Sequence, residues 1–430
     1  MENFNKVNKY IKDNNINVLS FDDLNKLKED LCKKFDYNYD IITEICNRIF
    51  VRKYELCDNL SFDNGSNAFR KEKFHAIEIP KEYKKAEEHF NYLYNLPQPE
   101  QRSKEWYEYR NKRITASDTA TAIDQNPYES IEGFYLKKCD PNFPFRDNAT
   151  VFHGRKYEPI ATMIYEHIYN TKVFEFGALP SKDYPYLGAS PDGICSIYTL
   201  DNKFSTRLEI GLEIKCPVTR IIYIKGKIAG EICPYYYYCQ IQQQLLCCEL
   251  KYCDFWQCKL IEYKNKREYL IDEKFGDNTE GTDGTITTIN NKLKKGLFLE
   301  LYPRNFKPEF EDDNPEWKSK YIYPNRLDMT TEQYDSWALQ MLDELKDNSL
   351  HKDYYFHRIV YWKLDHSHNV TIERDEKFLK ANIPILKNTF EKMMYYRANL
   401  DKLPELQVIA DRRKKYIKLN TSYKITNEFI

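Results

Sequence analysis

The chain has 430 residues, which is enough to bury a large core and to hold more than one domain. Its formal net charge of −1 supplies no overall field that attracts nucleic acid, so DNA binding would need a local basic groove. No apolar run approaches the roughly 18 residues of a membrane-spanning helix, and residues 1–6 lack the apolar core of a signal peptide. These features predict an intracellular protein.

The first 95 residues predict a helical N-terminal extension. Ser20 can cap a helix, and the residues that follow place apolar side chains at helical spacing: Leu24, Leu27, Leu31, Ile41, Ile42, Ile45 and Ile49. Pro97 and Pro99 separate this extension from the next unit. It could bind a partner or DNA, or it could serve only as a helical cap on the main domain.

Residues 106–118 combine three cations with a run of small residues. Arg110, Lys112 and Arg113 precede Ser117, which is predicted to cap a short helix over 118–123. A phosphate held by the Arg110 guanidinium, the Ser117 hydroxyl and backbone amides is chemically reasonable. A solvated basic turn is the alternative.

Residues 153–168 run into an apolar helical pattern. Pro159 fits the first turn of a helix or a kink, which predicts Glu158 near the start of that helix. A lone glutamate at such a position is ordinarily a surface residue that complements the helix dipole.

Residues 188–217 are the most informative stretch. Apolar and polar residues alternate strictly from Leu208 to Lys215, which predicts a strand with Glu213 and Lys215 on one side and Ile214 in the core. Asp192 lies in a turn before a second short strand over 194–197, so the two strands would bring Asp192 beside Glu213. Two carboxylates and an amine at a strand end form an oxygen-rich site for Mg²⁺, with an amine that can orient a water.

The rest of the chain is predicted from periodicity. Residues 235–246 form a helix that carries Gln240, Gln243 and Gln244 on one face, and residues 252–258 form a strand. Residues 263–345 carry no recognisable motif and are interpreted as an insertion, with a loop over 277–287 and a helix over 330–345. A strand at 354–360, a helix over 375–400 and a basic tail at 401–430 complete the chain.

The segment Ser-Pro-Asp-Gly (190–193), followed by Leu-Glu-Ile-Lys-Cys-Pro (212–217), resembles the YqaJ-type viral recombinases, the family of the phage lambda exonuclease. Three further motifs of the family match in order: Arg110 seven residues before Ser117, the step from Gly154 to Glu158, and Gln240 after a pair of tyrosines. The resemblance implies an α/β, restriction-endonuclease-like core, a central mixed sheet flanked by helices, within residues 96–400.

The same resemblance implies a Mg²⁺-dependent DNA exonuclease that acts 5′-to-3′ on the ends of linear duplex DNA in viral recombination, repair or replication. Two ions are expected, with Mn²⁺ able to substitute: Asp192, Glu213 and the Ile214 carbonyl hold one, and Glu158 with Asp192 the other. Lys215 would orient or help deprotonate the water, and Gln240 would contact that water or the scissile phosphate. Arg110 and Ser117 would bind the 5′-terminal phosphate.

The family also implies a single-strand annealing protein as partner, a ring trimer, and action in the host cytoplasm or virus factory of a large DNA virus. Three alternatives stay open: an endonuclease of the same fold, an iron–sulfur nuclease of the RecB type, and a catalytically silent DNA-binding scaffold. Eight of the twelve cysteines lie between Cys195 and Cys258, but none form a Cys-x-x-Cys pair. Buried, reduced thiols are the simpler interpretation.

Overall fold

The computed structural model describes residues 2–14, 16, 21–39, 41–42, 45–46, 77–99, 101, 103–143, 149–272, 295–307, 314–347 and 352–413. The chain divides into two compact units. The first combines Met1–Phe69 with Ile261–Lys363, and the second combines Arg70–Leu260 with Leu364–Ile430.

The second unit is built on a mixed sheet. Its strands lie in the order β2 (Val173–Phe174), β5 (Gly193–Cys195), β6 (Gly211–Lys215), β7 (Tyr252–Glu262) and the C-terminal part of β10 (Tyr354–Glu373). β5 pairs antiparallel with both β2 and β6, whereas β6 pairs parallel with β7. Strand β6 is buried along nearly its whole length, as expected for a central strand covered on both faces.

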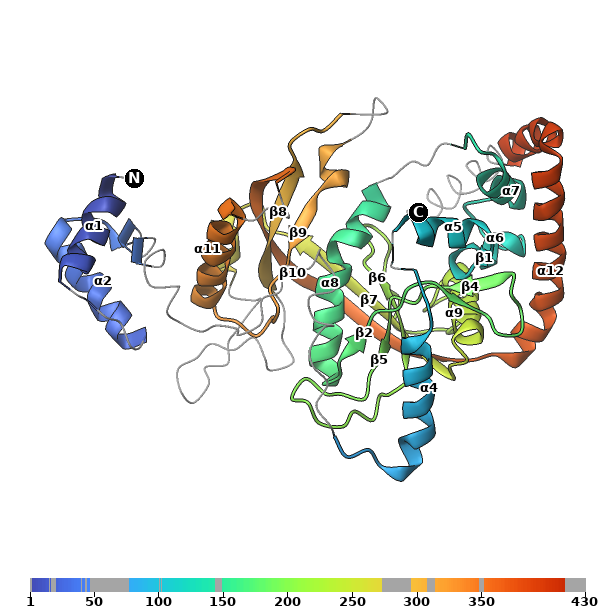
Figure 1. The fold of residues 1–430 in the computed structure, drawn as a ribbon, viewed down its shortest axis with the longest axis horizontal. Coiled ribbons are helices and arrows are strands. Elements are labelled where there is room, and N and C mark those ends of the chain that lie inside the picture. Colours follow the sequence, from blue (N-terminus) through green and yellow to red (C-terminus); the bar gives the residue numbers. More distant parts are fainter. Residues whose placement is uncertain are drawn as a thin grey trace. The chain divides into compact units, whose positions relative to one another are not determined.

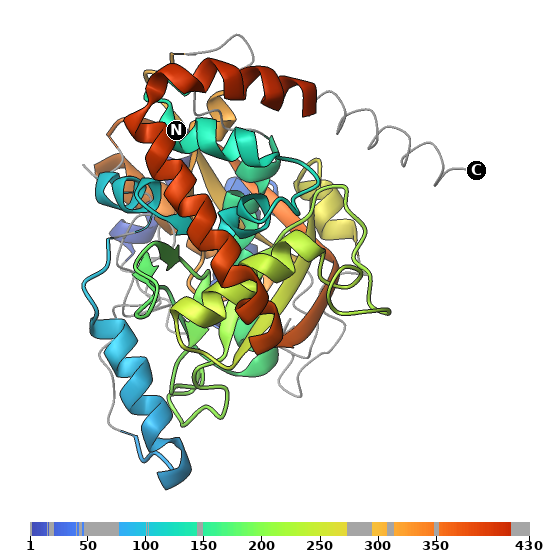
Figure 2. The same ribbon diagram turned by 90° about the vertical axis from the view of Figure 1, so that its right-hand side faces the viewer.

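Helices cover both faces of this sheet. α8 (Ala149–Tyr169) packs on one face, where the Trp256 indole of β7 donates to the Ala161 carbonyl at 2.9 Å. α9 (Tyr235–Cys247) lies on the opposite face (Figure 1), and α12 (Glu376–Ala398) crosses it in Figure 2. The predicted α/β core, a mixed sheet flanked by helices, is confirmed.

A smaller sheet joins the segments that carry the predicted motifs. β4 (Leu187–Ala189) lies between β1 (Ile114–Thr115), its parallel neighbour, and β3 (Leu179–Pro180), its antiparallel neighbour. The second unit also contains the shorter helical elements η2 (Lys81–Tyr83), α4 (Lys84–Asn95), α5 (Lys104–Asn111), η3 (Ala116–Asp118), α6 (Thr119–Ala122), α7 (Ile131–Cys139) and η6 (Leu400–Lys402). A shared apolar core holds α7, α9 and α12 against this sheet, and includes Ile114, Phe134, Leu187, Leu246 and Met393.

The first unit contains most of the predicted insertion. β8 (Lys295–Pro303) pairs antiparallel with β9 (Lys320–Ile322) and with the N-terminal part of β10. α11 (Thr331–Asp347), the helix predicted at 330–345, packs Tyr334, Trp337 and Met341 against Leu297 and Leu299 of β8. α10 (Lys266–Ile271), η4 (Pro315–Lys318), α1 (Glu2–Asp13) and α2 (Phe21–Phe35) complete its described elements.

Three local predictions are wrong. The central strand begins at Gly211 rather than Leu208, because Glu209 has φ +67° and residues 205–210 turn. α8 begins at Ala149, so Pro159 lies inside the helix and Glu158 near its middle. Ser117 does not cap a helix: Thr115 caps η3 and exchanges hydrogen bonds with Asp118 in a capping box, and Asp118 is the N-cap residue of α6.

Two predicted segments fall outside this description. The loop predicted at 277–287 lies outside the described residues, as does the end of the basic tail from residue 414; residues 403–413 are helical. Among the described helices, none combines the length and the apolar character needed to cross a membrane.

Candidate functional site

Four residues predicted to act together meet where β5 and β6 lie side by side. Asp192 immediately precedes β5, Glu213 and Lys215 belong to β6, and Glu158 comes from α8. The Ile214 backbone N–H donates to Asp192 Oδ2 at 2.7 Å, which fixes this carboxylate against β6. We name Glu158, Asp192, Glu213 and Lys215 the carboxylate site.

Glu213 is fully buried and is held by three side-chain donors. The Lys215 ammonium contacts Oε1, and Gln240 Nε2 donates to the same oxygen at 2.7 Å. Gln244 Nε2 donates to Oε2 at 2.6 Å. Gln240 and Gln244 are one helical turn apart on α9. From one face of the helix they therefore donate hydrogen bonds to both carboxylate oxygens of Glu213. The sequence predicted Gln240 but missed Gln244, although the four-residue spacing was its signal.

Burial and neighbouring charges shift the pKa values of Asp192 and Lys215 in the carboxylate site. Burial, followed by the charges of Glu213 and Glu158, raises the pKa of Asp192 well above its ordinary value, and Lys215 only partly offsets this. Burial alone would lower the pKa of Lys215, but Glu213 and Asp192 raise it instead. In the structure the Lys215 ammonium donates to Glu213.

The donor set of the carboxylate site matches a hard divalent cation in its chemistry. Three carboxylates and the Ile214 carbonyl offer only oxygen, the ligand that Mg²⁺ prefers. Their mutual repulsion, visible in the raised pKa of Asp192, is relieved by a cation. In the part of the chain that the structure describes, no three His, Cys, Asp or Glu side chains stand as a ready-made metal cluster. Glu213 instead faces Lys215 and the two glutamines.

A second polar cluster surrounds the end of α5. Arg110 Nη2 donates to Ser117 Oγ at 2.9 Å, and the Arg110 guanidinium lies 4.3 Å from the centroid of the Trp106 ring. The structure thus brings together the two residues predicted to bind a phosphate. We name Arg110, Ser117, Asp118, Lys137 and Lys138 the Arg110 cluster.

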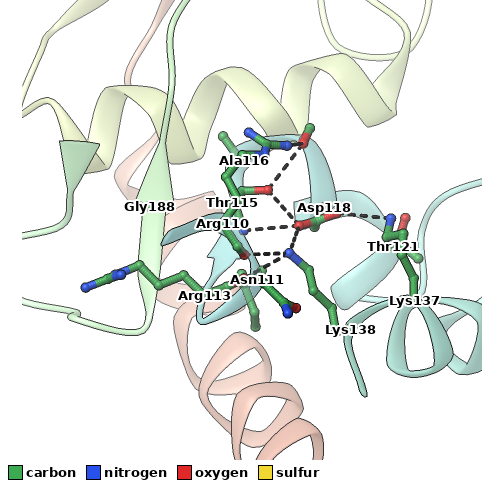
Figure 3. Close-up of polar contacts among 12 residues, drawn as sticks. Arg110, Asn111, Arg113, Thr115, Ala116, Asp118, Thr121, Lys137, Lys138 and Gly188 are labelled. Atoms are coloured by element: carbon green, nitrogen blue, oxygen red, sulfur yellow. Dashed lines mark hydrogen bonds and ion pairs between the residues drawn. The ribbon is translucent and has the colours of Figure 1, made fainter. Parts of the chain in front are cut away.

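Asp118 organises the cations of the Arg110 cluster. Its buried carboxylate accepts Lys138 Nζ at 2.8 Å and Lys137 Nζ at 3.2 Å. Burial alone would raise the pKa of Asp118, but Lys138, Lys137 and Arg110 together lower it well below its ordinary value. Lys138 also donates to the carbonyls of Arg110 (2.8 Å) and Arg113 (3.1 Å), so it fixes the main chain that carries Arg110 (Figure 3). No motif in the sequence pointed to either lysine.

Gln243 of α9 contacts the segments that lead to the Arg110 cluster, while the same helix contacts the carboxylate site. Gln243 Nε2 donates to the Ile114 carbonyl of β1 at 2.9 Å and to the Gly188 carbonyl of β4 at 3.0 Å. Its Oε1 accepts the Thr119 hydroxyl at 2.8 Å. α9 therefore holds Glu213 through Gln240 and Gln244, and holds the strand that leads to Ser117 through Gln243.

The cysteines of residues 195–258 behave as buried thiols. All eight are buried, and burial raises the pKa of Cys248 to about 12. Burial likewise raises the pKa of Cys258 well above its ordinary value. These residues therefore pack as small, buried side chains.

Comparison with known proteins places these motifs in a family. Residues 105–251 match the model of the YqaJ-like viral recombinase domain. An uncharacterized protein of Acanthamoeba polyphaga mimivirus is 33% identical over 348 residues, which cover 79% of this chain and 62% of that protein. The chain therefore spans about three-fifths of the length of this relative.

Two solved structures show a limited likeness. An alkaline exonuclease from Laribacter hongkongensis is 16% identical, with a TM-score of 0.34, over 70% of this chain and 97% of that chain. A complex of that protein with dAMP gives the same identity and TM-score over 71% of this chain and 100% of that chain.

The family model spans every residue of the carboxylate site and of the Arg110 cluster, together with Gln240 and Gln244. The motifs of the sequence had pointed to the same family. Residues 105–251 of this chain are thus similar to the YqaJ-like viral recombinase domain.

Proposed function

We propose that this chain is a metal-dependent deoxyribonuclease that digests linear duplex DNA from its 5′ ends. The observation that carries the proposal is the carboxylate site, where Glu158 and Glu213 raise the pKa of Asp192 beside the Lys215 ammonium. Three carboxylates and one amine, in a domain of the YqaJ-like family, suit phosphodiester hydrolysis.

In this function the carboxylates are cation ligands. Asp192, Glu213 and the Ile214 carbonyl would hold one Mg²⁺ or Mn²⁺, and Glu158 with Asp192 a second. When bound, such ions polarise the phosphodiester and lower the pKa of a bound water. Lys215 would orient the attacking water or help to deprotonate it. Gln240 and Gln244 keep both Glu213 oxygens in place.

The Arg110 cluster would hold the terminal phosphate. Ser117 is exposed, and its hydroxyl accepts from Arg110, so both groups are available to a phosphate oxygen at the surface. The surplus of cations around Asp118 favours an anion there. A 5′ phosphate bound at this position would direct digestion to begin at a 5′ end.

Digestion of four DNA substrates tests the proposal. The substrates are a linear duplex with 5′ phosphates, the same duplex with 5′ hydroxyls, a covalently closed plasmid and the nicked plasmid. We expect Mg²⁺-dependent loss of the linear 5′-phosphorylated duplex, slower loss of the hydroxyl form, no cutting of the closed plasmid, and no activity in excess EDTA. Cutting of the closed plasmid would favour an endonuclease, and intact linear DNA would favour a silent scaffold.

The biological setting is part of the same proposal. The exonuclease would serve viral DNA recombination, repair or replication in the host cytoplasm or virus factory, with a single-strand annealing protein to bind the strand that it exposes. A ring trimer would let it encircle the product. Sedimentation of the purified chain, alone and with duplex DNA, would show whether that assembly forms.

A further inference from the structure

A fully buried glutamine, Gln257 of β7, lies beside the carboxylate site without belonging to it. β6 and β7 run parallel, and their register pairs Glu213 with Phe255 and Lys215 with Gln257. Residues paired in this way on adjacent strands lie about 4.8 Å apart and project from the same face of the sheet. Gln257 is therefore the cross-strand neighbour of Lys215.

The contacts of the preceding residues show which face of the sheet Gln257 occupies. Trp256 projects toward α8, where its indole donates to a main-chain carbonyl at 2.9 Å. Phe255 projects toward α9, where its ring centroid lies 5.8 Å from that of Tyr237. Because successive side chains of a strand alternate, Gln257 shares the α9 face with Phe255. That face also carries the carboxylate site, since α9 donates to Glu213.

The side-chain amide of Gln257 is only partly satisfied. Its Nε2 donates to the Ile232 carbonyl at 3.4 Å, which is long for a hydrogen bond. Its Oε1 is buried, and no described residue donates to it. Buried amide oxygens nearly always have a donor, so this one indicates a contact that the protein makes in another state.

Both oxygens of Glu213 are occupied by side-chain donors in this structure. Oε1 accepts from Lys215 and Gln240, and Oε2 accepts from Gln244. A cation held by Glu213 would repel the Lys215 ammonium but not the neutral glutamine amides. Lys215 is therefore the donor that has to leave Glu213 when a cation binds.

A displaced Lys215 needs another acceptor, because its side chain is only 22% exposed. Asp192 would itself hold the cation, and the Tyr237 ring, 4.8 Å away, offers its face but no lone pair. Gln244 also has an amide oxygen without a donor among the described residues. Lys215 lies against Tyr237, however, which is two helical turns before Gln244 on α9. Gln257 Oε1 is the acceptor beside the lysine.

We propose that Gln257 is a positioning residue for Lys215, and that its Oε1 accepts the Lys215 ammonium when Glu213 holds a cation. This inference rests on the proposed function and deepens it. Gln257 and the Tyr237 ring would together keep Lys215 in a fixed place from which it can orient a water. The new hydrogen bond would also offset the loss of the contact with Glu213, so that Gln257 favours cation binding.

Binding of Mn²⁺ in the absence of DNA tests the proposal without any cleavage. Free Mn²⁺ gives an electron paramagnetic resonance signal that is lost on binding. Gln257→Leu removes the acceptor, so its affinity for Mn²⁺ should fall about tenfold or more, the scale of one charge-assisted hydrogen bond. Gln257→Glu keeps an acceptor oxygen and should bind Mn²⁺ at least as tightly as the unmodified chain. Unchanged affinity in Gln257→Leu would overturn the proposal, because water would then serve Lys215 equally well.

A double-mutant cycle shows whether Gln257 acts through Lys215. In Lys215→Met there is no ammonium to displace, so adding Gln257→Leu should change the Mn²⁺ affinity by less than about twofold. If Gln257→Leu weakens Mn²⁺ binding by the same factor in both backgrounds, its effect does not pass through Lys215 and the proposal fails.

Gln242 offers a matched control, because it is also fully buried but its amide is satisfied on both sides. Its Nε2 donates to the Glu373 carbonyl at 3.0 Å, and its Oε1 accepts from the Asp375 backbone N–H at 2.7 Å. Gln242→Leu should lower the melting temperature more than Gln257→Leu does, since it breaks two good hydrogen bonds, and leave the Mn²⁺ affinity unchanged. An equal loss of Mn²⁺ affinity in both variants would indicate a general packing effect and contradict the proposal.

The same titration separates failure of this inference from failure of the proposed function. If the unmodified chain does not bind Mn²⁺, or if Asp192→Asn binds it equally well, the carboxylate site is not a cation site and both are wrong. Mn²⁺ binding that depends on Asp192 but not on Gln257 would overturn this inference alone.

Discussion

The carboxylate site and the Arg110 cluster each contain a buried aspartate. The pKa values of these two aspartates shift in opposite directions. Around Asp192 the nearest charges are Glu213 and Glu158, and the pKa is raised. Around Asp118 they are Lys138, Lys137 and Arg110, and the pKa is lowered. The direction of the pKa shift thus indicates a surplus of negative charge around Asp192 and of positive charge around Asp118. One region is suited to cations, and the other to an anion such as phosphate.

A third buried carboxylate shows what a structural role looks like. Asp254 on β7 is fully buried and accepts from Tyr165 (2.8 Å), Asn369 (2.8 Å), Thr371 (2.6 Å) and the Arg207 guanidinium. Every neighbour is a donor, so the carboxylate is satisfied by the protein alone. Asp192 has two like charges beside it, and this contrast supports its proposed role as a cation ligand.

The largest expected effect comes from neutralising the carboxylate site. Asp192→Asn keeps the shape of the side chain but removes one ligand charge, and Mg²⁺-dependent digestion of linear duplex should fall by about 10³-fold or more. The melting temperature should not fall, because repulsion from Glu158 and Glu213 is removed at the same time. Asp183→Asn, at an exposed position, is the control. Digestion preserved at saturating Mg²⁺ would remove Asp192 from the site.

Removing a lysine from the Arg110 cluster should lower the stability of the fold. Lys138→Met leaves Asp118 buried with fewer counter-charges, and unfolding in urea should become easier by about 3 kcal/mol. Adding Asp118→Asn to the same chain should recover part of that loss. In the unmodified chain the contribution of Asp118 is present above its ordinary pKa of 3.8 and is lost as the pH falls through its lowered folded value. An unchanged urea midpoint in Lys138→Met would show that this pair does not organise the cluster.

Lys215 distinguishes a donor to the reaction from a simple DNA-binding cation. Lys215→Ala should lower the single-turnover rate by ~10²-fold while the affinity for duplex DNA in Ca²⁺ stays within a few-fold. Parallel losses of rate and affinity would make Lys215 a phosphate-binding residue instead.

The smallest expected effect is on the preference for one kind of DNA end. Arg110→Ala removes one charge-assisted hydrogen bond, worth about 1.5–3 kcal/mol, so preference for a 5′ phosphate over a 5′ hydroxyl should shrink by ~10-fold or more. Digestion of the hydroxyl duplex should change little. If both duplexes slow alike, or if the unmodified chain shows no preference, the Arg110 cluster does not bind the terminal phosphate.

Local spacing in the sequence was enough to predict much of the carboxylate site. Strands repeat every two residues, so the alternation around Ile214 determines that Glu213 and Lys215 share a side, and the structure places them in contact. The helix at 235–246 was predicted for the same kind of reason, since its pattern is set by neighbours along the chain. The motifs also pointed to the family whose model residues 105–251 match, because they stand in its order.

Tertiary structure alone decided which charges surround each residue. Lys138 is 28 residues from Arg110 in sequence yet donates to its carbonyl, and no local pattern encodes that contact. Pro159 lies inside α8, and Thr115 caps η3 although Ser117 was the predicted cap, because packing and hydrogen bonds outweighed local preference at both places. Coulomb interactions depend on distance through space and on burial, so the opposite pKa shifts of Asp118 and Asp192 exist only in the folded chain.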